Sequence, residues 1–124
     1  MSTDNQYSIG QFSKLTGLSP DTLRYYERQH LLTPLRGTRN LRYYSNQHQE
    51  RIALIRRLKG GGFSIAEIQK YLELRSHHGT FQQRRDYLAK QLITLHERQQ
   101  KLNASIDYVQ TKMAILDDWI ANDK

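Results

Sequence analysis

Residues 18–28 read Leu-Ser-Pro-Asp-Thr-Leu-Arg-Tyr-Tyr-Glu-Arg, and this stretch carries most of the information about the fold. A serine followed by proline favours a helix start, because the serine hydroxyl can cap the helix and proline suits its first turn. We therefore expect a helix over 19–30, ended by Thr33-Pro34. Its polar side chains are of the types that bind phosphates and base edges of DNA. The candidates are Thr22, Arg24, Tyr25 and Arg28.

A second short helix is predicted just upstream, over 8–15. Ser8 with Gln11 fits a capping box, and Gly17 suits the turn that follows. Two short helices joined by such a turn are typical of a helix-turn-helix, whose second helix enters the major groove. The apolar residues expected to pack where the helices cross are Ile9, Phe12, Leu15, Leu18 and Leu23. A helical hairpin without a role in DNA binding would show the same pattern.

The helical period disappears between Pro34 and Ser45. A Gly and an Asn in this segment favour a turn around 37–40, and β-favouring residues follow. Two short strands here would form a hairpin that carries Arg36, Arg39 and Arg42. A basic hairpin beside a recognition helix is typical of a DNA-binding wing, which contacts flanking phosphates or the minor groove. A solvated basic loop is the alternative.

Three more helices are expected, over 45–59, 64–75 and 80–119. Ser64 with Glu67 and Thr80 with Gln83 fit capping boxes, and Gly60-Gly61-Gly62 ends the first of these helices. The last one has apolar residues spaced by four and three, the heptad period of a coiled coil. This row, which we call the seam, is Leu88, Leu92, Leu95, Gln99, Leu102, Ile106, Val109, Met113, Leu116 and Ile120. Because so narrow a stripe needs a partner helix, we predict a homodimer.

Gln99 is the polar member of the seam, near its middle. One hypothesis is that two copies of Gln99 meet in the dimer and fix its register at some cost in stability. The other is that Gln99 faces solvent in a slightly interrupted seam.

Charge is concentrated in the first half of the chain. The net charge is +7, and residues 1–60 hold ten Lys and Arg against four Asp and Glu, a surplus of six. Such a surplus favours a polyanionic partner. The chain has no cysteine, which excludes disulfides and thiol chemistry. It has neither a membrane-length apolar run nor the pattern of a signal peptide, so we expect a cytoplasmic protein.

Several motifs, taken in order, resemble the MerR family of bacterial transcription regulators. They are Tyr7-Ser8-Ile9-Gly10-Gln11, Thr22-Leu23-Arg24-Tyr25-Tyr26-Glu27, Leu31-Leu32-Thr33-Pro34, Arg42-Tyr43-Tyr44-Ser45 and Gly62-Phe63-Ser64-Ile65-Ala66-Glu67-Ile68. The resemblance implies a winged helix-turn-helix that dimerises through an antiparallel coiled coil. It further implies binding to a pseudo-palindromic promoter, which the dimer bends and untwists so that RNA polymerase can engage it. Family wings usually read Gly-Tyr-Arg, whereas this chain has Asn40-Leu41-Arg42.

The sequence thus predicts a mainly α protein with two parts. Residues 1–76 would form the winged helix-turn-helix domain, and residues 77–124 a linker and the coiled-coil helix. The predicted function is a homodimeric regulator of transcription that binds double-stranded promoter DNA. The alternative is an architectural, excisionase-like DNA-bending protein. We predict no enzymatic activity, metal or cofactor, because no catalytic arrangement stands out and His77-His78 lacks a third ligand. The sequence identifies no effector.

Overall fold

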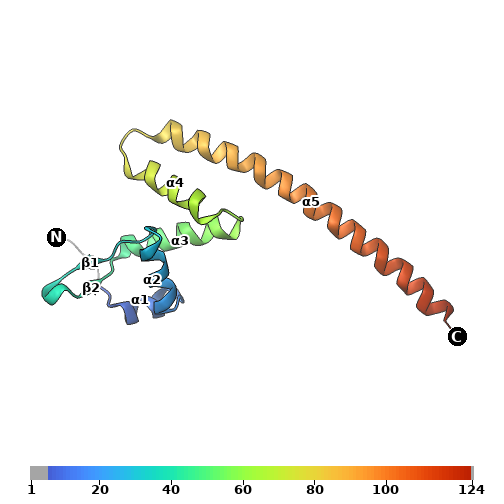
Figure 1. Ribbon diagram of the computed structural model, residues 1–124, viewed down its shortest axis with the longest axis horizontal. Coiled ribbons are helices and arrows are strands. Elements are labelled where there is room, and N and C mark those ends of the chain that lie inside the picture. The colour runs from blue at the N-terminus through green and yellow to red at the C-terminus, as the bar shows by residue number, and fades with distance from the viewer. Residues whose placement is uncertain (1–5, 124) are drawn as a thin grey trace. The chain divides into compact units, whose positions relative to one another are not determined.

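The computed structural model describes residues 6–123, and these are mainly helical (Figure 1). They divide after Thr80 into two units, which are considered separately. The first unit contains four helices and a two-stranded hairpin among its described residues, and the second is a single long helix. The elements are α1 (Ile9–Thr16), α2 (Pro20–Arg28), β1 (Leu35–Arg36), a 3-10 turn (Thr38–Asn40), β2 (Arg42–Tyr43), α3 (Asn46–Gly60), α4 (Ile65–Ser76) and α5 (Phe81–Asn122).

Three of the helices begin at predicted serine caps. Each of three serine hydroxyls accepts a bond from the backbone N–H three residues later, at 3.2 Å for Ser8 and 3.1 Å for Ser19 and Ser64. Such bonds satisfy amide groups that have no partner within the helix. The α1 helix ends at Gly17, whose φ of 75° is left-handed and therefore favours glycine. The predicted capping box of Thr80 with Gln83, both of which the structure describes, is not formed. The Thr80 hydroxyl instead donates to the carbonyls of Leu74 (2.6 Å) and His77 (3.0 Å), which closes the turn after α4.

One apolar core holds the first unit together. The Phe12 and Tyr44 rings stack with centroids 4.5 Å apart, which joins α1 to the segment after β2. Residues from α2, α3 and α4 surround this pair, so the helix-turn-helix is fixed to the rest of the unit. The core residues are Phe12, Leu23, Tyr26, Leu31, Leu32, Tyr44, Ile52, Ile55, Ile68 and Leu72.

Leu15 departs from the predicted core. Its side chain is 43 % exposed, whereas Phe12 and Leu23 are fully buried and Ile9 and Leu18 pack at the edge. The buried face of α1 runs through Phe12 and Thr16, one helical turn apart, and Leu15 lies about 80° from the middle of that face. Thr16 can be buried because its hydroxyl donates to the Phe12 carbonyl at 2.9 Å.

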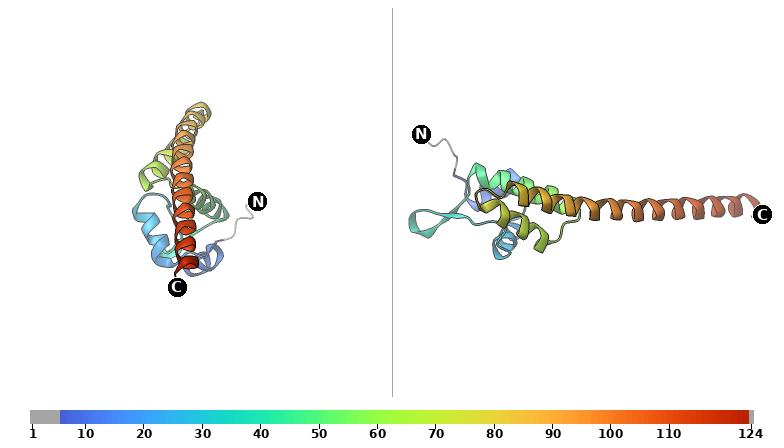
Figure 2. Two further views of the ribbon diagram at one scale, coloured as in Figure 1. Left: turned by 90° about the vertical axis from the view of Figure 1, so that its right-hand side faces the viewer. Right: turned by 90° about the horizontal axis from the view of Figure 1, so that it is seen from above.

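The predicted hairpin is present, and we call residues 35–43 the wing. Its strands are antiparallel, with Leu35 opposite Tyr43 and Arg36 opposite Arg42. At the tip, Arg39 and Asn40 have positive φ angles of 60° and 57°. The wing projects from the helices of the first unit, as the right-hand view of Figure 2 shows. Backbone bonds of 2.8 Å in both directions between Tyr7 and Tyr44 tie the wing's base to the segment before α1.

The second unit is the 42-residue helix α5. A helix of this length extends about 63 Å at 1.5 Å per residue. It reaches Asn122, three residues beyond the predicted end. Most of its apolar side chains are exposed, including Leu102 (61 %) and Met113 (57 %). Within residues 6–123, no helix combines the length and apolar character needed to cross a bilayer.

Candidate nucleic-acid interface

The α2 helix presents a polar face opposite its buried one. Leu23 and Tyr26 anchor the helix in the core, which leaves Arg24, Tyr25 and Arg28 on its exposed side. The Arg28 guanidinium lies 6.0 Å from the centroid of the Tyr25 ring, within the range of a cation–π contact. All three are side chains for which DNA binding was predicted, and α2 gathers them on one surface.

Local contacts near the start of α2 hold two of the predicted side chains. The Thr22 hydroxyl lies 3.0 Å from that of Ser19, and Arg24 forms an exposed ion pair with Asp21, also at 3.0 Å. An exposed pair of this kind contributes little to stability, about 0–1 kcal/mol. Arg24 can therefore exchange Asp21 for a phosphate at small cost.

The wing carries two exposed arginines, Arg36 and Arg39. The Arg36 guanidinium donates to the Asn40 carbonyl at 3.2 Å, and this bond braces the turn. Leu41 is 67 % exposed at the same end of the wing. The tip therefore combines positive charge with one solvent-facing apolar side chain.

Arg42, the third predicted wing arginine, is placed differently. Its guanidinium pairs with the Glu27 carboxylate of α2 at 3.4 Å, and the two side chains are only 28 % and 15 % exposed. The Tyr44 hydroxyl donates to the other Glu27 oxygen at 2.5 Å. Burial, and then this bond to Glu27, raise the pKa of Tyr44 well above its ordinary value, so the phenol stays protonated as the donor. Glu27 thus joins the wing to α2. In this structure the Arg42 guanidinium is engaged in that joint rather than exposed like Arg36 and Arg39.

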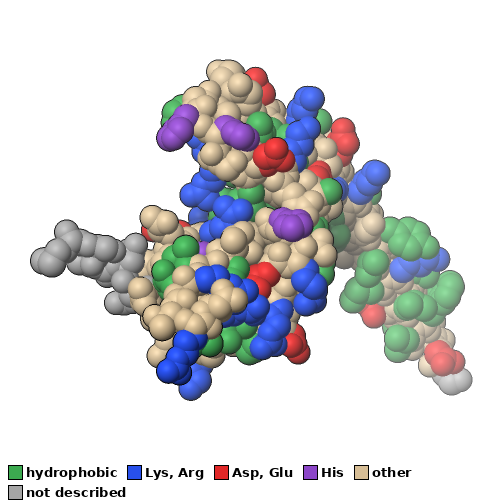
Figure 3. Space-filling model, turned by 60° about the vertical axis from the view of Figure 1, so that its left-hand side comes forward, with side chains coloured by type: hydrophobic (Ala, Val, Ile, Leu, Met, Phe, Trp, Pro, Cys, Tyr) green, Lys and Arg blue, Asp and Glu red, His purple; other side chains and the backbone are tan. Residues whose placement is uncertain are grey.

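Further cations lie on α3, and the site prediction did not include them. Arg56, Arg57 and Lys59 are exposed, and the Lys59 ammonium lies 5.6 Å from the centroid of the Tyr26 ring. Basic side chains are spread over the face of the first unit that is turned to the viewer in Figure 3. These cations are part of the charge surplus of residues 1–60. The sequence pattern predicted a helix there but did not show that these side chains lie on its exposed face.

The predicted seam lies along α5, and most of its apolar side chains are exposed. Its members from Leu102 to Leu116 are each at least 45 % exposed. A second group, Tyr108, Ile115 and Trp119, is also exposed. At 100° per residue it lies on another face of the same helix. Only the first row was identified from the sequence. The second row has heptad spacing too, with intervals of seven and four residues, but it is short and the polar Lys112 lies between its members.

Comparison with known proteins supplies the context for these surfaces. The family model described as "MerR HTH family regulatory protein" matches residues 7–75, and the model "MerR, DNA binding" matches residues 49–112. The transcriptional regulator PA4778 of Pseudomonas aeruginosa is 34% identical over 114 residues, which are 91% of this chain and 82% of that protein.

Solved structures agree with the fold. A crystal structure described as a MerR family transcriptional regulator from Listeria monocytogenes superposes with a TM-score of 0.76 at 30% identity, covering 86% of this chain and 82% of that one. HiNmlR, described as a MerR family regulator lacking the sensor domain and bound to promoter DNA, superposes with a TM-score of 0.75. Its identity is 22% and the match covers 89% of both chains, so it supports the fold alone.

Proposed function

Because the chain belongs to the MerR family of helix-turn-helix transcription regulators, we propose that it binds promoter DNA as a homodimer and deforms it. The expected site is pseudo-palindromic, with one half-site for each copy. By family resemblance, RNA polymerase engages the promoter after the dimer has bent and untwisted it. The protein would act in the cytoplasm as a regulator rather than an enzyme.

The observation that carries this proposal is the joint between α2 and the wing. Glu27 ties the wing to α2 through Arg42 and Tyr44, and this leaves Arg24, Arg28 and Arg39 exposed. An α2 helix in the major groove and a wing on the flanking backbone would together give both base and phosphate contacts.

Deformation of the duplex requires many phosphate contacts. Bending a site of 20–30 base pairs costs on the order of 1–6 kcal/mol, which contacts made by the protein must offset. Two copies of the basic first unit would supply them, because each neutralised phosphate releases counterions and adds to the affinity.

Dimerisation is proposed from the seam. Exposed apolar side chains such as Leu92, Leu102 and Val109 are unfavourable in water for an isolated helix, and a second copy of α5 would cover them. The family resemblance implies that the two helices run antiparallel. The same row argues against the excisionase-like alternative, since a DNA-bending module that works as a monomer has no need for it.

Footprinting tests the proposal on DNA that includes the promoter beside the protein's own gene. We expect protection of two symmetric half-sites and enhanced cleavage between them, where the duplex is distorted. Protection without distortion would remove the untwisting mechanism and leave simple DNA binding.

The predicted contacts can be tested by the salt dependence of binding. Arg24→Ala and Arg39→Ala should each weaken binding and reduce the slope of log K against log salt by about one, if each side chain neutralises one phosphate. Fluorescence anisotropy with a labelled duplex measures this slope. Lys90→Ala removes an exposed cation of α5 and should leave it unchanged. Equal slopes in all the variants would refute the assigned surface.

A further inference from the structure

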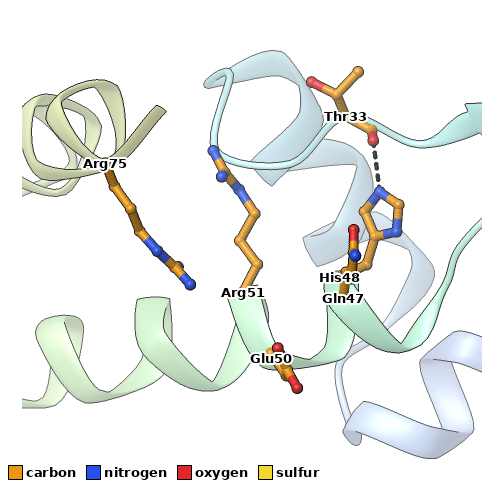
Figure 4. A pocket seen from close by; sticks show the side chains of 6 residues that line it. All are labelled: Thr33, Gln47, His48, Glu50, Arg51 and Arg75. Atoms are coloured by element: carbon orange, nitrogen blue, oxygen red, sulfur yellow. Dashed lines mark hydrogen bonds between the residues drawn. The ribbon is translucent and has the colours of Figure 1, made fainter. Parts of the chain in front are cut away.

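A polar hollow of about 490 Å³ lies within the first unit. It is bounded by α3, by the end of α4 and by the segment between α2 and β1 (Figure 4). None of its lining residues belongs to the α2 face or to the wing. The lining residues are Thr33, Gln47, His48, Glu50, Arg51 and Arg75.

Arg51 is held in place on the α3 side of the hollow. Its Nε donates to the Leu31 carbonyl at 2.6 Å, which fixes the guanidinium and leaves its terminal N–H groups available. Within residues 6–123, no carboxylate forms an ion pair with Arg51 or with Arg75. A half-buried guanidinium normally has such a partner, because burial of an unpaired charge is costly.

Arg75 enters the same hollow from α4, facing the side from which Arg51 rises (Figure 4). Burial and, next, the charge of Arg75 lower the pKa of Arg51. Two cations that repel each other in this way would be stabilised by an anion between them.

The other lining residues add hydrogen-bonding groups without positive charge. The Ser45 backbone N–H donates to His48 Nδ1 at 2.9 Å, so the imidazole carries its proton on Nε2 and donates it to the Thr33 carbonyl at 2.7 Å. The Gln47 amide also lines the hollow and makes no hydrogen bond to another described residue.

Two carboxylates lie near the arginines. Glu50 lines the hollow, but its side chain leaves α3 in the opposite direction from Arg51 in the view of Figure 4. Glu73 lines an adjoining hollow with Arg51. Neither carboxylate forms an ion pair with the two arginines.

We propose that Arg51 and Arg75, assisted by the Gln47 amide, bind a small molecule that carries an oxyanion, either a phosphate or a carboxylate. The planar N–H fork of a guanidinium matches both groups. The volume of the hollow falls within the range of about 300–1,000 Å³ that is typical of small-molecule sites. A bound oxyanion would join α3 to α4 by a charge-assisted bridge. This site is independent of the proposed DNA surface.

The test measures the melting temperature of the full chain against inorganic phosphate and against acetate, with chloride holding the ionic strength constant. We expect a saturable rise with at least one probe, because a ligand of the folded state stabilises it by mass action. Arg75→Gln should abolish the rise. This variant is preferred to one at Arg51, whose bond to Leu31 also supports the fold. Lys90→Gln, which removes an equal charge from α5, should retain the rise.

No rise in the unmodified protein, or the same rise in Arg75→Gln, would overturn the proposal. DNA is another source of phosphate, and anisotropy with a duplex distinguishes it. If the oxyanion comes from a small molecule, Arg75→Gln leaves the salt slope of DNA binding unchanged. A slope reduced by about one, together with no response to either probe, would assign Arg75 to the DNA backbone and refute a small-molecule site.

Discussion

The first unit and the α5 helix differ in how they cover their apolar side chains. In the first unit Phe12, Leu23 and Ile55 are completely buried by neighbouring elements. In α5, Leu102 and Met113 are more than half exposed, although they are just as apolar. The first unit therefore completes its core within one chain, whereas α5 presents a surface that a second chain would complete. Fold stability therefore rests on the first unit, whereas the proposed assembly would rest on α5.

Net positive charge is also concentrated in the first unit rather than in α5. Residues 1–60 carry six surplus cations, whereas residues 81–124 hold seven Lys and Arg against six Asp and Glu. Electrostatic attraction to DNA is therefore expected from the first unit, and apolar association from α5.

The largest effect is expected from a charge in the seam. Leu102→Asp should prevent dimerisation, because pairing would bury a carboxylate without a partner. DNA affinity should fall about 10²–10⁴-fold, since the two binding units would no longer act together. Sedimentation and anisotropy measure the two quantities. Gln100→Asp, on the polar side of α5, is the matched control. A dimer that persists in Leu102→Asp would show that the seam does not pair the chains.

A cavity in the core of the first unit should have the next largest effect. Ile55→Ala should reduce the free energy of unfolding by about 2–5 kcal/mol, because its fully buried side chain leaves a void. Urea denaturation measures this change. Leu41→Ala, at the exposed tip of the wing, should change the stability by less than about 0.5 kcal/mol. Equal losses in the two variants would contradict the observed packing.

A smaller effect is expected at the joint between α2 and the wing. Glu27→Gln should cost about 1–3 kcal/mol, because it weakens a charge-assisted bond from Tyr44 and removes the ion pair with Arg42. Asp21→Asn breaks the exposed pair with Arg24 and should cost no more than about 1 kcal/mol. Urea denaturation of both variants ranks them, and a greater loss in Asp21→Asn would refute the joint.

The smallest effect is expected at Gln99. If two copies of Gln99 meet in the dimer, Gln99→Leu should raise the melting temperature by a few degrees and loosen the choice of register. Calorimetry measures the first, and disulfide trapping between cysteines introduced along α5 reports the second. A lower melting temperature would favour the alternative, in which Gln99 faces solvent.

Local sequence patterns predicted the helices and strands well. They did not predict side-chain pairs between residues that are distant in the sequence. Ser8, Ser19 and Ser64 mark helix starts because a cap depends on residues only three positions apart. The Glu27–Arg42 pair joins residues from different elements, so Arg42 was predicted only as a DNA contact.

Two further features of the first unit were missed for the same kind of reason. Leu15 was expected in the core because it is apolar, but the sequence does not show which side of so short a helix is covered. The hollow between Arg51 and Arg75 depends on the packing of α3 against α4, which no local motif encodes.

The carboxylate of Glu27 has a geometric consequence for the proposed DNA surface. Because one side chain holds both the wing and α2, the two cannot tilt independently without breaking its bonds to Arg42 and Tyr44. If α2 enters the major groove and the wing contacts the flanking backbone, as proposed, the protein fixes the interval between these two contacts. A duplex whose groove width does not match that interval would then have to change its twist to bind, so the joint would make binding depend on DNA shape.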